Sequence, residues 1–190
     1  MIHRVVLGFL VSLVSVSLAT AKTPQLAEVA QRASTSLPRV VYLMRHADKP
    51  ASAGDPHLSA AGVARAGKLP GYFPGLLGGQ KLDAIFATSA SKNSNRPVET
   101  ATPLAASLNL PLNQSYGNRS YGALAGAIRS GSYAGKTILI VWHHGTMPAL
   151  AGALGASAPG KWPSSSFGLI WKVTYNADGS ASLQQIQEPF

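Results

Sequence analysis

The chain has 190 residues, no cysteine and a formal net charge of +9, with 16 Lys and Arg against 7 Asp and Glu. This length predicts one domain, and a hydrophobic content of 46% is enough to build its core. The basic residues are scattered and form no run with interleaved aromatics, so we expect no nucleic-acid partner. The absence of cysteine excludes disulfides and lipid attachment at a processed cysteine.

The first 21 residues have the pattern of a secretory signal peptide. His3 and Arg4 precede an apolar stretch, and Ala19-Thr20-Ala21 forms a small-residue cleavage site. The stretch is short for a membrane span, so we favour residues 1–21 as a cleaved signal over an anchor. We therefore expect a secreted or periplasmic bacterial protein with no stable membrane insertion after cleavage. Residues 22–38 are expected to form an N-terminal arm or helix ahead of a domain that covers residues 39–190.

Short apolar runs predict strands at residues 40–44, 82–88 and 137–142. Helices are predicted from Ser59, as N-cap, towards residue 68, and at residues 97–108 and 148–154. Residues 113–133 are expected to form a loop that influences specificity.

Two β-rich runs, at residues 167–175 and 181–186, flank the turn sequence Asn176-Ala177-Asp178-Gly179 and predict a hairpin. Because strands and helices alternate before it, the sequence predicts an α/β fold. We expect a three-layer α/β/α sandwich with a mostly parallel central sheet and a C-terminal antiparallel hairpin.

Charged and polar residues follow the three predicted strands. Arg45 and His46 end the first strand, residues 88–89 end the second and lead to Arg96, and His143 and His144 end the third. The carboxyl ends of parallel strands share one edge of a sheet, so we expect these side chains to converge. Guanidinium forks match phosphate oxygens, and a neutral imidazole nitrogen can attack phosphorus. The cluster therefore predicts phosphoryl transfer to His46.

The predicted reaction requires no metal or cofactor, because side-chain cations supply the positive charge. Adjacent histidines such as His143 and His144 point in divergent directions, and the chain has no cysteine. The few acids are not spaced like metal ligands, so we predict no metal site.

Four motifs in order resemble those of the histidine phosphatase superfamily, which includes phosphoglycerate mutase-like phosphatases. Arg45-His46-Ala47 after an apolar strand resembles its Arg-His-Gly signature, with Ala in place of Gly. His57-Leu58-Ser59-Ala60-Ala61-Gly62 resembles its Leu-Ser/Thr-x-x-Gly helix start. Thr88-Ser89 followed by Arg96-Pro97-Val98-Glu99-Thr100-Ala101 resembles its Ser…Arg-x-x-Glu/Gln-Thr-Ala segment, and residues 138–150 resemble the strand that delivers a second catalytic histidine.

The resemblance covers residues 39–155 and implies a phosphohistidine at His46. It also implies that Arg45, Arg96 and the later histidine hold the phosphate. Alignment on Trp142 favours His144 as that histidine, whereas alignment on Thr146 and Pro148 favours His143. We favour His144 as the catalytic residue and keep His143 as the alternative and as a candidate phosphate ligand. Neighbours at a strand end face opposite ways, so only one of them can enter the pocket.

The general acid that must protonate the leaving alcohol is not evident. Residues 104–142 contain no Asp or Glu, and Asp48 is the acid nearest to the nucleophile in sequence. Asp48 is a candidate proton donor, with Asp55 as the other candidate; alternatively, Asp48 pairs with Lys49 or caps a turn. Glu99 is expected to orient an arginine. A weak donor would favour good leaving groups such as aryl phosphates, phosphoanhydrides or phosphohistidine.

The sequence therefore predicts a metal-independent phosphatase that acts on a phosphorylated small molecule or a phosphoprotein. The alternatives are a phosphomutase, which a signal peptide disfavours, and an anion-binding protein on the same fold without efficient turnover. No interface pattern predicts an oligomeric state.

Overall fold

The computed structural model describes residues 28, 36–52, 54–157 and 160–190. The predicted signal peptide and most of the predicted arm lie outside the described residues. The described chain is built around a six-stranded sheet with the order β3-β2-β4-β1-β5-β6.

Four neighbouring strands of this sheet are parallel. They are β3 (Leu112–Tyr116), β2 (Ala84–Thr88), β4 (Thr137–Trp142) and β1 (Val40–Arg45). The last two strands, β5 (Leu169–Tyr175) and β6 (Ala181–Gln187), form an antiparallel hairpin, and β5 pairs antiparallel with β1. The predicted mostly parallel sheet with a C-terminal hairpin is confirmed.

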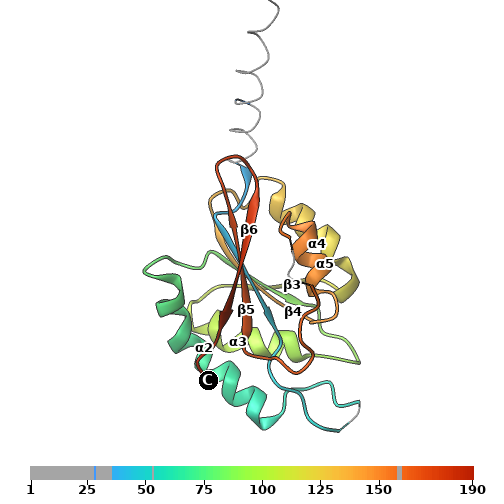
Figure 1. Ribbon diagram of the computed structural model, residues 1–190. Helices are drawn as coiled ribbons and strands as arrows, with labels where there is room; N and C mark the ends of the chain where they lie inside the picture. The colour runs from blue at the N-terminus through green and yellow to red at the C-terminus, as the bar shows by residue number, and fades with distance from the viewer. Residues whose placement is uncertain (1–27, 29–35, 53, 158–159) are drawn as a thin grey trace, which may run out of the picture.

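Helices cover both faces of the sheet (Figure 1). On one face lie α2 (Ala60–Leu77) and α3 (Arg96–Ser107), and on the other lie α4 (Tyr121–Arg129) and α5 (Met147–Ala153). Alternate residues of β1 point to the two faces: Val41 and Leu43 pack in the core with α4 and α5, and the intervening Tyr42 packs with α2. The structure thus has the predicted three layers. None of the described helices is long and apolar enough to cross a membrane.

Helix α2 continues well past its predicted end. Pro70 and Pro74 lie inside it, but Leu69, Phe73 and Leu77 are buried at helical spacing on one side. Burial of this stripe against the sheet outweighs the cost of the prolines. Gly78 then ends the helix in the left-handed conformation, with φ 59°.

The expectation of a loop at residues 113–133 was wrong, because this segment contains most of β3, a short 3₁₀ turn (Asn118–Ser120) and α4. The helix buries Leu124, Ala125 and Ile128, which have helical spacing and are a signal that sequence reasoning could have used. Strand β3 is polar and lies at the edge of the sheet, so its sequence lacks the apolar run or alternation that predicts a strand.

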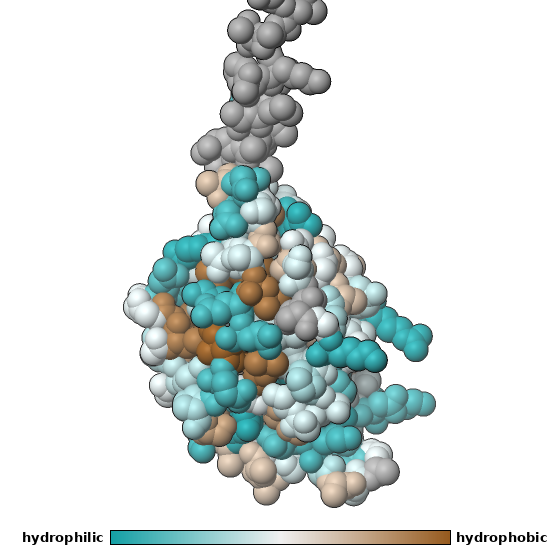
Figure 2. All heavy atoms as spheres, in the orientation of Figure 1, coloured by the Kyte–Doolittle hydropathy of each residue, from teal (hydrophilic) through white to brown (hydrophobic). Residues whose placement is uncertain are grey.

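The other edge strand, β6, alternates between half-buried and exposed residues. The face of the molecule shown in Figure 2 accordingly mixes apolar patches with hydrophilic side chains.

Candidate active site

The pairing register of β1 with β4 brings two histidines together. Arg45 lies opposite Trp142, and the His46 N–H donates to the Trp142 carbonyl at 3.0 Å. The next residues, His46 and His143, therefore leave the sheet side by side. Their ring centroids are 5.4 Å apart, with the rings inclined at 69°.

The backbone determines which nitrogen of His46 is free. Nδ1 lies 2.7 Å from the Ala47 carbonyl oxygen. Because a carbonyl only accepts, Nδ1 carries the hydrogen, and Nε2 keeps its lone pair in the neutral ring. Burial, followed by the charges of His143, Arg45 and Arg96, lowers the pKa of His46 to about 3, although the Ala47 hydrogen bond acts the other way. His46 is thus a neutral imidazole with an available Nε2.

Arg45 is buried beside His46, with 2% of its surface exposed. Its Nη1 donates to the carbonyls of Ser164, at 2.5 Å, and Ser166, at 3.3 Å. Its Cζ lies 3.8 Å from the centroid of the Phe167 ring. Burial lowers the pKa of Arg45 to about 10, so the guanidinium remains charged at neutral pH.

Arg96 begins α3 and approaches the same cluster. Its Nη1 donates to the Asp55 carbonyl at 2.6 Å. The Nε atoms of Arg45 and Arg96 are both buried without a hydrogen-bond partner, and neither guanidinium forms an ion pair with a described residue. Two partly buried cations with spare donors form a site that an oxyanion would complete.

Thr100 links the nucleophile to the helix that carries Arg96. The Ala47 N–H donates to the Thr100 hydroxyl at 2.8 Å, and this hydroxyl donates to the Arg96 carbonyl at 2.7 Å. Thr100 is fully buried. Its position four residues after Arg96 lets its hydroxyl reach both the Arg96 carbonyl and the Ala47 N–H. It ties the first turn of α3 to the loop after β1.

The start of α2 is tied to the same loop. The Asp48 carbonyl accepts from the N–H of Ser59 at 3.0 Å and from its hydroxyl at 3.2 Å, and the Ser59 oxygen caps the N–H of Gly62 at 3.1 Å. A Cβ on Gly62 would collide with the Asp48 carbonyl. The spacing of Ser59 and Gly62 therefore lets α2 pack directly on the backbone after His46.

The carboxylates near the cluster all have partners. Asp48 accepts from Arg65 Nε at 2.9 Å, so it pairs with neither Lys49 nor a turn. Asp55 accepts from the His57 N–H at 2.9 Å. With one oxygen held by Arg65, the Asp48 carboxylate is poorly placed to release a proton to a substrate, and we do not retain it as the proton donor.

The expectation that Glu99 orients an arginine was wrong. Glu99 accepts from the Leu58 N–H at 2.8 Å and lies 2.5 Å from His57 Nδ1. This hydrogen bond raises the pKa of His57. Glu99 thus holds the loop that carries the Asp55 carbonyl, and it acts on Arg96 only through that loop.

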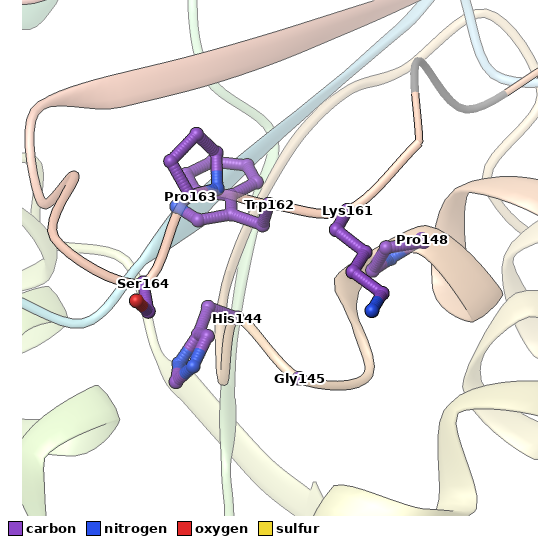
Figure 3. Close-up of a pocket in the computed structure, with 7 residues that line it drawn as sticks. All are labelled: His144, Gly145, Pro148, Lys161, Trp162, Pro163 and Ser164. Atoms are coloured by element: carbon purple, nitrogen blue, oxygen red, sulfur yellow. The ribbon is translucent and has the colours of Figure 1, made fainter.

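The arrangement of the two histidines places His143, and not His144, beside the His46 ring. His143 contacts the His46 ring, and burial, with the charge of Arg96, lowers the pKa of His143 to about 4. His144 instead lines a neighbouring cavity of about 500 Å³ (Figure 3), whose wall includes Ser164. The strand register places His143 next to His46, and the following residue faces this cavity.

Trp142 packs at the strand end, as predicted, and is fully buried. Its Nε1 donates to the Thr146 hydroxyl at 3.0 Å, which donates to Asn118 Oδ1 at 2.6 Å. These bonds anchor the turn that carries His143 and His144. The Asn118 contact comes from the segment that the sequence predicted to be loop.

Within the described part of the chain, no three His, Cys, Asp or Glu side chains come together as metal ligands. The metal independence inferred from the sequence stays a prediction.

The sequence matches no family model and no curated protein. The structure, by contrast, is similar to several solved structures. A protein histidine phosphatase SixA complexed with tungstate shares 18% identity, with a TM-score of 0.53, over 78% of this chain and 96% of that one. Phosphoglycerate mutase from Plasmodium falciparum shares 16% identity, with a TM-score of 0.53, over 80% of this chain and 94% of that one.

A phosphoserine phosphatase from Entamoeba histolytica, in complex with 3-phosphoglyceric acid, shares 12% identity, with a TM-score of 0.52. That similarity covers 80% of this chain and 98% of that one. These proteins are all members of the histidine phosphatase superfamily. The chain therefore has the histidine phosphatase, or phosphoglycerate mutase-like, fold, and the resemblance seen in the sequence is confirmed at the level of the fold.

Proposed function

We propose that this protein is a phosphatase that hydrolyses phosphomonoesters through a phosphohistidine on His46, without a metal. One observation carries the proposal: the Ala47 carbonyl holds Nδ1–H of a buried neutral His46, so that Nε2 is left as the nucleophile. Two nearby arginines, whose charges act on His46, have buried Nε atoms without a hydrogen-bond partner. The names of the similar structures, among them a protein histidine phosphatase and a phosphoserine phosphatase, support a phosphatase reaction.

In the proposed reaction the phosphate binds to Arg45 and Arg96. Nε2 of His46 attacks phosphorus in line, and the bond to the leaving oxygen breaks. The Ala47 carbonyl keeps Nδ1–H in place, so it stabilises the positive charge that the ring acquires. Water then attacks the phosphohistidine and releases phosphate.

His143 is the second histidine in this proposal. Burial and the charge of Arg96 lower the pKa of His143 and favour its neutral form. A bound phosphate dianion acts in the opposite direction and favours the protonated ring. His143 would thus add a donor, or a charge, where the equatorial oxygens become more negative.

The substrate class that we propose is a phosphorylated small molecule or phosphoprotein, and the place of action is the periplasm or the exterior. The signal-like pattern of residues 1–21 supports the location. Sequencing the N-terminus of protein recovered from the periplasm or the medium tests it, with residue 22 as the expected first residue.

The central experiment is turnover of p-nitrophenyl phosphate by the purified protein in the presence of a chelator. We expect hydrolysis by the wild type and none by His46→Ala. Gln184→Ala is the control, because it removes an exposed side chain of the edge strand β6. An alkaline quench, which phosphohistidine survives, should trap labelled phosphate on the wild type and not on His46→Ala. Undiminished turnover by His46→Ala would overturn the nucleophile assignment.

The second candidate is an anion-binding protein without turnover. It is favoured by the hydrogen bonds of the described carboxylates near the cluster: Asp48 accepts from Arg65, Glu99 from the Leu58 N–H, and Asp55 from the His57 N–H. Tungstate binding by calorimetry distinguishes the two: tight binding without a phosphohistidine and without hydrolysis would identify the binding protein.

A further inference from the structure

The cavity lined by His144 lies directly beside the proposed phosphate site. Its wall includes Ser164, whose carbonyl accepts a hydrogen bond from Arg45, and His144 directly follows His143 in the chain. Figure 3 shows the His144 ring beside Ser164, and Lys161 across the cavity near Pro148. A phosphate held by Arg45 would therefore have open space next to it on this side, where the rest of the substrate must lie.

The volume and lining of the cavity fit the leaving group of a phosphomonoester. The cavity volume of about 500 Å³ is within the range of ordinary small-molecule binding sites. Trp162, Pro163 and Pro148 supply apolar surface, and His144, Lys161 and Ser164 supply polar groups. Among the described residues that line the cavity, none is Asp or Glu.

His144 is the group in this cavity that is suited to proton transfer. Its ring forms no hydrogen bond with any described residue, unlike the nearby carboxylates of Asp48, Asp55 and Glu99. Lysine is a weak acid at neutral pH and serine a weaker one, whereas imidazole titrates in the physiological range. Burial, with the charges of Arg45 and Lys49, lowers the pKa of His144. The negative charge of a bound phosphate dianion acts in the opposite direction and favours the imidazolium that donates the proton.

We propose that the cavity receives the leaving group and that His144 is the general acid that protonates it. This inference rests on the proposed phosphatase function. It gives the two adjacent histidines separate tasks: His143 meets the phosphate and His144 meets the ester oxygen.

Protons are conserved in both half-reactions. In the first, His46 Nε2 forms a bond to phosphorus, the phosphorus–oxygen bond breaks, and the released oxygen takes a proton from the His144 imidazolium. In the second, neutral His144 takes a proton from water as that water attacks the phosphohistidine. Phosphate leaves with His46 Nε2 free again and His144 again protonated.

The test is a series of aryl phosphates that differ in leaving-group pKa. General acid catalysis matters most for poor leaving groups, which cannot depart as anions. His144→Gln should lower kcat/KM for phenyl phosphate by about 100-fold or more, but by less than about threefold for 2,4-dinitrophenyl phosphate. His144→Glu, which restores an acid, should recover part of the activity on phenyl phosphate.

Gln184→Ala is the control, because it changes an exposed side chain of the edge strand β6, which does not line the cavity. It should keep the wild-type dependence on leaving-group pKa. Equal losses by His144→Gln on good and poor leaving groups would contradict the proposal. If His144→Gln fails to fold, the aryl phosphate series is measured on the wild type alone. A steep fall of its kcat/KM as the leaving-group pKa rises would show that no general acid operates and would contradict the proposal. Loss of the proposed function would look different, because His46→Ala would then remain active or no phosphohistidine would form.

Discussion

At the scale of the residue, the chemistry depends on the environment of one imidazole. The Ala47 carbonyl selects the tautomer of His46, and burial keeps the ring neutral. The motif Arg45-His46-Ala47 therefore contains both the proposed nucleophile and the carbonyl that orients its ring.

The low pKa of His46 predicts a displaced acid limb in the pH profile. Activity needs the neutral ring, and this form is lost only as the pH falls through a pKa of about 3 instead of the ordinary 6.5. We expect kcat/KM, which reports the free enzyme, to persist at about pH 5 after correction for titration of the substrate. An acid limb that sits near the ordinary histidine pKa would show that His46 is not shielded as described.

At the scale of the element, the site depends on how closely α2 and α3 approach the loop after β1. Thr100 of α3 accepts the Ala47 N–H, and the cap of α2 binds the Asp48 carbonyl. Two helices thus hold the two residues that follow His46.

Gly62 is the position where this approach is tightest, and Gly62→Ala should push α2 away from Asp48. We expect the free energy of unfolding to fall by about 1–3 kcal/mol and kcat to fall with it. Gly67→Ala is the matched control in the same helix, because nothing lies within 4 Å of its added methyl group. It should be neutral or stabilising by up to about 1 kcal/mol. Denaturant titration and assays of both variants check this, and equal stability in the two would argue against the close contact.

At the scale of the whole molecule, the C-terminus is joined to the site through Arg65. This α2 residue donates to Asp48 at 2.9 Å and to Glu188 at 2.6 Å. The Glu188 side chain is fully buried, and its N–H donates to the Gly168 carbonyl at 2.8 Å. The C-terminus accordingly lies beside α2 in Figure 1. Burial raises the pKa of Glu188, and Arg65 offsets part of this effect.

Glu188→Gln should weaken this connection. It leaves Arg65 with a neutral partner, so we expect a loss of about 1–3 kcal/mol in unfolding free energy. Asp178→Asn, at an exposed acid in the β5–β6 turn, is the control and should change stability by less than about 0.5 kcal/mol. A double-mutant cycle with Arg65→Met measures the coupling; a coupling near zero would mean that Glu188 does not act through Arg65.

The amino-acid sequence alone predicts most of the strands and helices and the grouping of Arg45, His46 and Arg96. Hydrophobic periodicity is local, so β1, β4 and the C-terminal hairpin could be predicted closely. Arg45, His46 and Arg96 could be grouped because parallel strands end at one edge of a sheet. The polar edge strand β3 and the helix α4 were missed, although the buried residues of α4 have helical spacing.

Only the tertiary structure decided between His143 and His144 as the neighbour of His46. The two are adjacent in the chain, and the choice depends on the register that pairs Arg45 with Trp142. The partner of Asp48 also depends on the fold, because the packing of α2 places Arg65 beside it. The cavity that His144 lines with residues 161–164 is likewise formed only in the folded chain. Register, ion pairs and cavities join residues that are distant in sequence, so no local pattern encodes them. The sequence alone therefore predicts His46 as the proposed nucleophile, and the fold identifies the residues that contact it.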